Sequence, residues 1–117
     1  MIVDDALIMR MKIKQIAISS GWNIACEATN GLEAVELYKQ HQPDLVTLDL
    51  VMPELDGLGA LKQIMEFDSQ AKVVMVSAVD QKEKLEACIM GGAMDFIVKP
   101  FDVDRLRGFF DKYLNLE

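Results

Sequence analysis

The sequence predicts an α/β fold in which one five-stranded parallel sheet is covered by helices on both faces. Apolar segments of strand length alternate with segments of helical periodicity, and this pair occurs five times along the chain. The strand-like segments are apolar throughout, as expected for strands that are covered on both faces. This alternation of strands and helices favours a parallel sheet whose strands are joined by helical crossovers.

The first strand and helix are predicted within residues 2–20. Ile2-Val3 is short for a central strand, and we expect this strand to be incomplete at its N-terminal end. Apolar residues then recur at the spacing of one helical face over residues 6–20, and Gly21 is suited to end that helix. The face comprises Met9, Ile13, Ile16 and Ala17.

The second strand is expected over residues 22–28, which are mostly apolar. The second helix is expected over residues 32–41, with Leu32 and Val35 facing inward. Pro43 prevents this helix from continuing.

The remaining three pairs follow the same pattern. Strands are expected over residues 45–49, 72–77 and 96–98. Helices are expected over residues 58–67, 81–90 and 102–114. The apolar face of the first of these helices comprises Leu58, Leu61, Ile64 and Met65. Gly91-Gly92 ends the next helix, and Asp102 caps the last one.

The composition indicates a single domain with one packed core, because the chain has 117 residues and half of them are apolar. The formal net charge of −7 argues against nucleic acid as a direct partner. No apolar run approaches the roughly 20 residues that span a bilayer. No signal peptide is visible, since Asp4 and Asp5 interrupt the start. Cys26 and Cys88 share no metal-ligand spacing and indicate reduced thiols in a cytoplasmic protein.

Polar residues stand at the ends of four of the predicted strands. In a parallel sheet with right-handed crossovers, the carboxyl ends of all strands lie at one edge, where ligands bind. The residues that end such a strand or follow it directly are Asp4, Asp5, Asp49, Ser77 and Lys99. We therefore expect three acids, a hydroxyl and an ammonium group to form one site.

The chemistry of this group of residues favours a metal-assisted phosphoryl transfer. Three clustered carboxylates stay ionised together only with a compensating cation, and oxygen ligands favour a hard ion such as Mg²⁺. Asp49 would be the nucleophile that accepts a phosphoryl group, with Lys99 and Ser77 facing its oxygens. Each residue alone has a simpler interpretation. Asp4-Asp5 could be a helix N-terminal pair, Asp49 a loop cap, Ser77 a turn residue and Lys99 a solvated charge.

Four segments that together span the chain carry these residues. They are Ile2-Val3-Asp4-Asp5, residues 48–57, Val76-Ser77-Ala78 and residues 96–101. In combination they resemble the receiver domain of two-component response regulators, and in particular the single-domain receivers of the chemotaxis CheY type. The resemblance implies a flavodoxin-like, doubly wound sheet with strand order 2-1-3-4-5 and five flanking helices, formed by residues 1–117.

The resemblance also implies a role for each residue of the site. Asp49 would receive a phosphoryl group from the phosphohistidine of a histidine kinase. Mg²⁺ would be held by Asp4, Asp5, Asp49 and the backbone carbonyl of Val51. Lys99 would pair with Asp49 or with its phosphoryl group.

Two further residues would transmit the signal in a protein of this family. Phe96 would swing inward when Ser77 moves toward the phosphoryl group. A protein-binding face on the fourth helix, fifth strand and fifth helix would then bind an output protein or an attached output domain. The domain would catalyse only its own phosphorylation and dephosphorylation. Arg105, Arg107 and Asp95 either support a receiver homodimer or are solvated surface charges.

The sequence departs from the family pattern next to Asp49. Val51 and Val79 lie two residues beyond Asp49 and Ser77, where side chains in this family influence the attack of water on the acyl phosphate. Both are apolar and unable to hydrogen-bond that water, so we predict slow self-dephosphorylation.

The sequence argues against two alternative functions and leaves a third one open. A Mg²⁺-dependent hydrolase with an aspartyl phosphate intermediate would need a second acid where Val51 stands. A flavin or nucleotide carrier would need a Gly-rich loop where Asp4-Asp5-Ala6 stands. The chain could also be the receiver half of a DNA-binding response regulator.

Overall fold

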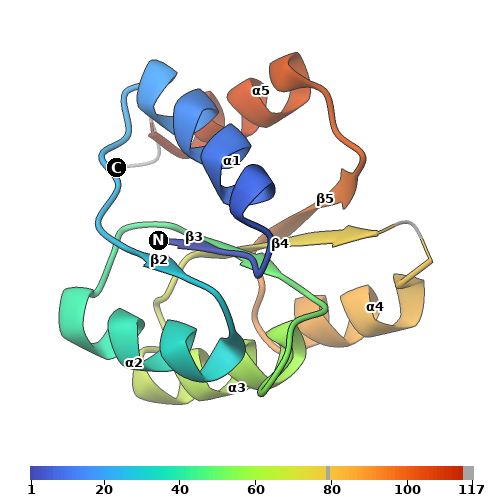
Figure 1. The fold of residues 1–117 in the computed structure, drawn as a ribbon. Helices are drawn as coiled ribbons and strands as arrows, with labels where there is room; N and C mark the ends of the chain where they lie inside the picture. The colour runs from blue at the N-terminus through green and yellow to red at the C-terminus, as the bar shows by residue number, and fades with distance from the viewer. Residues whose placement is uncertain (79, 115–117) are drawn as a thin grey trace.

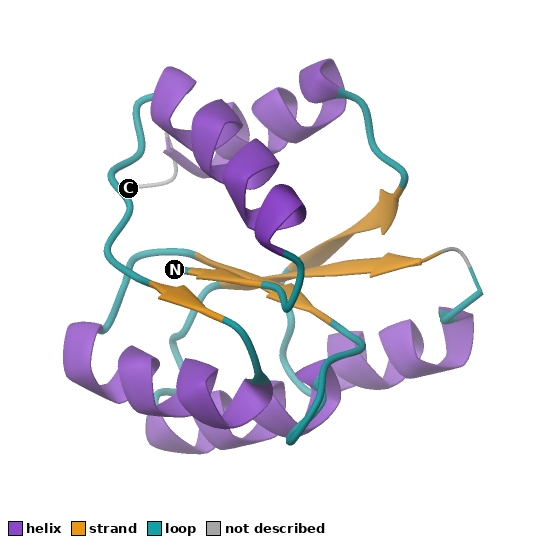
Figure 2. Cartoon of the chain, in the orientation of Figure 1, coloured by secondary structure: helices purple, strands orange, loops and turns teal. Residues whose placement is uncertain are grey.

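The computed structural model describes residues 1–78 and 80–114 of the chain (Figure 1). Strands and helices alternate from one end to the other, as the sequence predicts (Figure 2). The elements are β1 (Ile2–Val3), α1 (Leu7–Ser19), β2 (Glu27–Ala28), α2 (Gly31–His41), β3 (Val46–Asp49), α3 (Gly57–Phe67), β4 (Val73–Ala78), α4 (Lys82–Met90), β5 (Asp95–Lys99) and α5 (Val103–Leu114).

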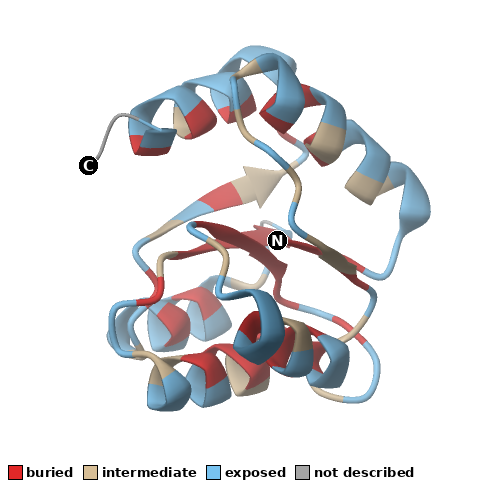
Figure 3. Ribbon diagram, turned by 90° about the vertical axis from the view of Figure 1, so that its left-hand side faces the viewer, coloured by how far each residue is buried: buried red, intermediate tan, exposed pale blue. Residues whose placement is uncertain are grey.

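The five strands form one parallel sheet in the order β2-β1-β3-β4-β5, which confirms the predicted topology. Helices α1 and α5 cover one face of this sheet, and α2, α3 and α4 cover the other (Figure 1). The buried residues follow the sheet and the inner faces of both helical layers (Figure 3). Because the strands are covered on both sides, most of their residues are apolar, and Asp49, Ser77 and Lys99 lie near the carboxyl ends.

The core is divided by the sheet into two clusters, because successive side chains of a strand point to opposite faces. Val3, Val73 and Met75 belong to the cluster on the side of α2, α3 and α4. Ile2 and Val74 belong to the cluster on the side of α1 and α5. This alternation fixes which residues of each strand can face the site at its end.

The helices α2, α3 and α5 each follow the carboxyl end of a strand, and a side chain caps the N-terminus of each of them. Asn30 accepts a hydrogen bond from the Glu33 backbone N–H at 2.8 Å. Asp56 accepts one from the Gly59 backbone N–H at 2.8 Å. Asp102 accepts one from the Arg105 backbone N–H at 2.7 Å, which confirms the cap predicted for the last helix.

Two details of the sequence prediction are wrong. The second strand covers only Glu27–Ala28 instead of residues 22–28, because its neighbour β1 offers only Ile2–Val3 for pairing. Leu32 does not face inward: it is 54% exposed, while the inner face of α2 is formed by residues such as Val35 and Tyr38. Other boundaries agree to within about two residues.

None of the described helices combines the length and the apolar character that crossing a membrane requires.

Candidate functional site

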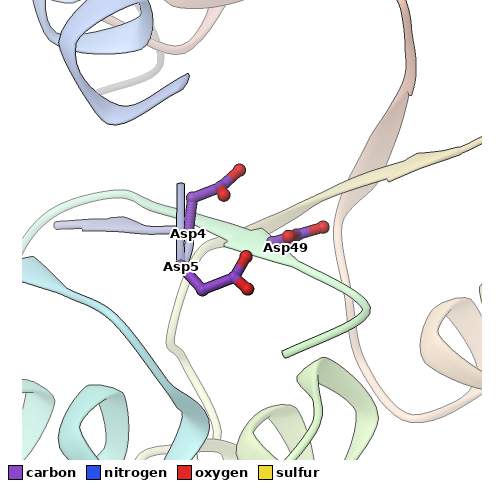
Figure 4. Close-up of side chains that lie close together, drawn as sticks. All are labelled: Asp4, Asp5 and Asp49. Atoms are coloured by element: carbon purple, nitrogen blue, oxygen red, sulfur yellow. The ribbon is translucent and has the colours of Figure 1, made fainter. Parts of the chain in front are cut away.

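Three carboxylates meet at the carboxyl ends of two neighbouring strands. Asp4 and Asp5 follow β1 directly, and Asp49 is the last residue of β3. Val3 pairs with Leu48 in the sheet, so the residues that come next on both strands lie at the same level. The carboxylates project toward the same side (Figure 4), and each offers an oxygen within 4.8 Å of the other two. The structure thus brings together all three acids that the sequence places at this edge.

Lys99 supplies the positive charge of the site. It is the last residue of β5, and its Nζ lies 3.0 Å from Asp4 Oδ2 and 3.4 Å from Asp49 Oδ1. Burial acts to lower the pKa of Lys99, but the hydrogen bond to Asp4 and the charges of Asp49 and Asp4 outweigh it and raise the pKa. The ammonium group therefore stays charged and partly offsets the acids.

The two acids that follow β1 are held in different ways. The Asp4 carboxylate is buried, and its Oδ1 accepts a hydrogen bond from the Ala6 backbone N–H at 2.9 Å while Oδ2 faces Lys99. Asp5 is exposed and, among the described residues, makes no hydrogen bond or ion pair. Asp5 is therefore the acid whose oxygens are most accessible to a ligand.

Asp49 is buried between its neighbours, with 10% of its side chain exposed. Its pKa is raised from 3.8 to about 6. Burial is the largest cause, the charge of Asp4 adds to it, and Lys99 acts in the opposite direction. A cation placed between the acids would stabilise the ionised carboxylate. The all-oxygen donor set and the crowded acids therefore fit a hard divalent ion such as Mg²⁺.

The loop after Asp49 passes very close to the strand end. Gly57 donates its backbone N–H to the Leu50 carbonyl at 2.7 Å. A Cβ at residue 57 would lie 2.7 Å from Leu50 Cα and would collide with the Asp49 carbonyl oxygen, so only glycine fits here. Val51, whose carbonyl is the predicted fourth ligand, lies in this loop with 55% of the residue exposed. Gly57 thus keeps the loop folded back onto the site.

Ser77 and Phe96 lie in the neighbouring strands β4 and β5. Ser77 is buried next to the site, since Val76 pairs with Asp49, and its hydroxyl donates to the Ala78 carbonyl at 3.0 Å. Phe96 is 38% exposed and lines an apolar groove of about 590 Å³ together with residues of α4. Val79, the second apolar residue of the predicted departure, lies outside the described residues.

One residue that contacts the site is missed by the sequence analysis. Arg10 Nη1 donates a hydrogen bond to the backbone carbonyl of Asp4 at 2.8 Å, and its Nε lies 3.3 Å from Glu27 Oε1. An arginine one turn after Asp4-Asp5, with an acid at the end of the second predicted strand, is the only signal in the sequence. A single charge on a helix is usually solvated, so that signal is weak.

A family model of the response regulator receiver domain matches residues 1–110 of the chain. The chain belongs to this receiver domain family. It is similar to the chemotaxis protein CheY of Bacillus subtilis, with 51% identity over 98% of this chain and 96% of the relative. It is also similar to CheY of Thermotoga maritima, with 50% identity over 91% of this chain and 88% of the relative.

Solved structures agree with this assignment. CheY in a CheX–CheY–BeF₃–Mg²⁺ complex from Borrelia burgdorferi matches with a TM-score of 0.86 and 44% identity, over 92% of this chain and 84% of that one. The receiver domain of NtrX from Brucella abortus matches with a TM-score of 0.90 and 31% identity, over 99% and 98% of the two chains. This CheY-like receiver domain is a phosphoacceptor of two-component signal transduction rather than a classical enzyme.

Proposed function

We propose that Asp49 is the phosphoacceptor of this receiver domain and takes its phosphoryl group from the phosphohistidine of a histidine kinase. Mg²⁺ would be held by Asp4, Asp5, Asp49 and the backbone carbonyl of Val51. The observation that carries the proposal is the group of three carboxylates whose oxygens lie within 4.8 Å of one another, with Lys99 beside them. The solved relative that contains CheY, BeF₃ and Mg²⁺ supports the choice of metal.

Asp49 is better placed than the other two acids to be the nucleophile. Both oxygens of Asp4 already have partners, namely the Ala6 backbone N–H and Lys99. Asp5 is exposed, whereas Asp49 is buried in the middle of the sheet edge with the Lys99 ammonium 3.4 Å away. A nucleophile in that position meets its substrate with a cation already in place to face the incoming negative charge.

The transfer exchanges one bond to phosphorus for another. An oxygen of ionised Asp49 forms a bond to phosphorus, and the bond between phosphorus and the donor histidine nitrogen breaks. The electron pair of that bond stays with the nitrogen, which becomes neutral imidazole after its protons equilibrate with water. Bound Mg²⁺ would neutralise charge on the phosphoryl oxygens. Lys99 would face the same oxygens, and Ser77 would donate its hydroxyl to one of them after leaving the Ala78 carbonyl.

Phosphorylation would then change the face formed by α4, β5 and α5. The phosphoryl group carries about two negative charges, and Ser77 would move toward it. Phe96, now 38% exposed, would swing into the space that Ser77 vacates and would alter the apolar groove beside α4. An output protein or an attached output domain would bind this face. Asp95 already has the Tyr113 hydroxyl at 2.7 Å and Lys112 at 3.7 Å within the chain, so a homodimer would have to compete with these contacts.

The extent of the domain is also part of the proposal. Residues 1–117 would form one receiver domain whose first strand is Ile2–Val3. Met1 already extends the ladder of β1, because its amine donates to the Leu45 carbonyl at 2.8 Å and its carbonyl accepts from the Thr47 N–H at 3.0 Å. A cavity of about 260 Å³ lies beside it and is lined in part by Trp22 and Phe110. Apolar residues added before Met1 are expected to raise the free energy of unfolding.

The predicted cytoplasmic location rests on the cysteines. Cys88 is buried and Cys26 is half-buried, and both are free thiols. The alternative of a Mg²⁺-dependent hydrolase is not favoured, because apolar Val51 occupies the position at which such an enzyme needs an acid.

Labelling with acetyl phosphate tests the phosphoacceptor. The chain is incubated with acetyl phosphate and Mg²⁺, and its intact mass is measured for the wild type, Asp49→Asn and Asp56→Asn. Asp56 is an exposed helix cap near the site, and asparagine caps a helix equally well, so this variant is the matched control. We expect one added phosphoryl group on the wild type and on Asp56→Asn, and none on Asp49→Asn. Undiminished labelling of Asp49→Asn, or an unlabelled wild type, would refute the proposal.

A further inference from the structure

Arg10 in the first turn of α1 touches the main chain that carries two of the three acids. Its Nη1 donates to the Asp4 carbonyl oxygen at 2.8 Å, and its Nε donates to Glu27 Oε1 at 3.3 Å. Only 13% of its side chain is exposed, so these contacts are largely shielded from water. A guanidinium group can hold both acceptors at once because its N–H groups are fixed in a planar fork.

This contact acts on Asp5 more than on Asp4. The Asp4 carboxylate has its own partners in the Ala6 N–H and Lys99. Asp5 has none among the described residues, so its position depends on the main chain. The carbonyl that Arg10 holds belongs to the planar peptide unit between Asp4 and Asp5. Its orientation therefore determines where the Cα of Asp5 lies, and with it the direction of the carboxylate.

Glu27 completes the arrangement from the neighbouring strand. It lies in β2 and pairs with Ile2 of β1, and its second oxygen is 3.4 Å from Lys14 Nζ. The ion pair with Glu27 restricts the guanidinium group to the position from which it reaches the Asp4 carbonyl. The three elements β1, β2 and α1 are thus joined next to the acids.

We propose that Arg10 is a positioning residue for the divalent-cation site, because it fixes the peptide unit between Asp4 and Asp5 and directs Asp5 toward Asp49. The inference rests on the proposed function, since it requires that the metal binds between these acids. Charge alone predicts the opposite effect of removing Arg10. A guanidinium group repels a divalent cation, so its loss would tighten Mg²⁺ binding if it acted only through its charge. The sign of the change therefore separates positioning from simple electrostatics.

Calorimetric titration of the unphosphorylated chain with Mg²⁺ tests this inference, with Arg10→Met as the variant and Lys14→Met as the matched control. Lys14→Met removes the same charge as Arg10→Met. The Lys14 ammonium group pairs with Glu27, whereas the Arg10 guanidinium group also donates to the Asp4 carbonyl. We expect Arg10→Met to raise the Kd for Mg²⁺ about 10-fold, as loss of groups that orient metal ligands does. Lys14→Met should leave the Kd unchanged or slightly lower. A Kd of Arg10→Met at or below that of the wild type overturns the proposal.

Two further measurements separate positioning from a folding defect. Urea unfolding in Mg²⁺-free buffer shows whether each variant is folded, and labelling by acetyl phosphate at saturating Mg²⁺ should recover toward the wild-type rate in Arg10→Met.

A third variant, Glu27→Gln, keeps Arg10 but removes its ion pair, and we expect it to raise the Kd for Mg²⁺ a few-fold. If Arg10→Met does not fold, an unchanged Kd in Glu27→Gln overturns the proposal. A wild-type chain that binds no Mg²⁺ would instead contradict the proposed function.

Discussion

The two ends of the sheet differ in what they bury. At the carboxyl end, Asp4, Asp49 and Ser77 are buried close together and Lys99 is half-buried beside them. At the amino end, the strands start among mainly apolar side chains next to a cavity of about 260 Å³. The same parallel topology therefore supports a charged site at one edge and ordinary packing at the other.

The carboxyl end of the sheet carries the functional groups, and these groups destabilise the folded state. The acids at the carboxyl end repel each other, and burial raises the pKa of Asp49 to about 6. An ionised Asp49 is thus a cost to the folded state that a bound cation would remove. No comparable group of acids is found at the amino end within the described residues. A substitution of Asp49 at the carboxyl end should consequently change how stability depends on pH and Mg²⁺, whereas a substitution at the amino end should not.

The largest effect is expected from Gly57→Ala at the carboxyl end. The added Cβ would collide with the Asp49 carbonyl and lie 2.7 Å from Leu50 Cα, so the loop must move away from the strand. We expect a loss of roughly 3 kcal/mol or more in the free energy of unfolding, measured with urea.

Gly108→Ala is the control for this substitution. Gly108 lies inside α5, and a Cβ there would meet no atom within 4 Å. Alanine should stabilise the helix by about 0.5–1 kcal/mol. Similar losses of stability in both variants would show that the close approach at Gly57 is unimportant.

The next effect is a pH dependence that Asp49 imposes in Mg²⁺-free buffer. Because its pKa is raised from 3.8 to about 6 in the folded state, the native protein binds more protons than the unfolded chain in this range. Protonated Asp49 stabilises the folded state relative to ionised Asp49. This stabilisation is complete below pH 3.8 and is lost as the pH rises through 6. It amounts to at most about 3 kcal/mol.

Asp49→Asn isolates this contribution, since it lacks the ionisable group and keeps the shape. The difference in unfolding free energy between the variant and the wild type should grow in favour of the variant from pH 4 to pH 7, as followed by urea unfolding at each pH. If the difference in unfolding free energy does not change between pH 4 and pH 7, ionisation of Asp49 does not destabilise the folded state.

At the amino end, a smaller gain is expected from Thr47→Val. The Thr47 hydroxyl is one of two buried side-chain groups in the described part of the chain that lack a hydrogen-bond partner. Valine has nearly the same shape and removes the unsatisfied group, so the free energy of unfolding should rise by about 1 kcal/mol. The Kd for Mg²⁺ should stay that of the wild type. A destabilised variant would mean that the hydroxyl has an acceptor in solution.

The smallest effect concerns the lifetime of the phosphoryl group. Val51 is exposed beside the site and cannot hydrogen-bond an attacking water. Val51→Asn introduces such a group, and we expect self-dephosphorylation to become several-fold faster, measured as decay of the labelled species after removal of acetyl phosphate. Val51→Ala controls for the change in size, and equal rates in all three proteins would count against the prediction.

Much of this arrangement was predictable from the sequence because parallel strands end at one edge. Asp4, Asp49 and Lys99 are far apart in the chain, yet each ends a strand or follows it directly, and strand ends are brought together by topology alone. The length of β2 was not predictable, because it depends on how many residues β1 offers for pairing. Leu32 was misplaced because periodicity identifies a helix face but not how far the neighbouring helix covers it.

Arg10 shows a second limit of the sequence. A charged residue on a helix is usually solvated, and only the close approach of α1 to β1 and β2 turns it into a contact of the site. Its two acceptors are a backbone carbonyl and Glu27, and neither leaves a recognisable motif. Residues that hold the main chain in place are thus harder to predict than those that end strands.

Unfolding of the wild type and of Asp49→Asn by urea at pH 7, with and without Mg²⁺, tests the central claim most directly. If the three carboxylates share a divalent cation, Asp49→Asn is the more stable protein without Mg²⁺, and Mg²⁺ stabilises the wild type more than the variant. Equal stabilisation of both proteins by Mg²⁺, or none of either, would contradict the account.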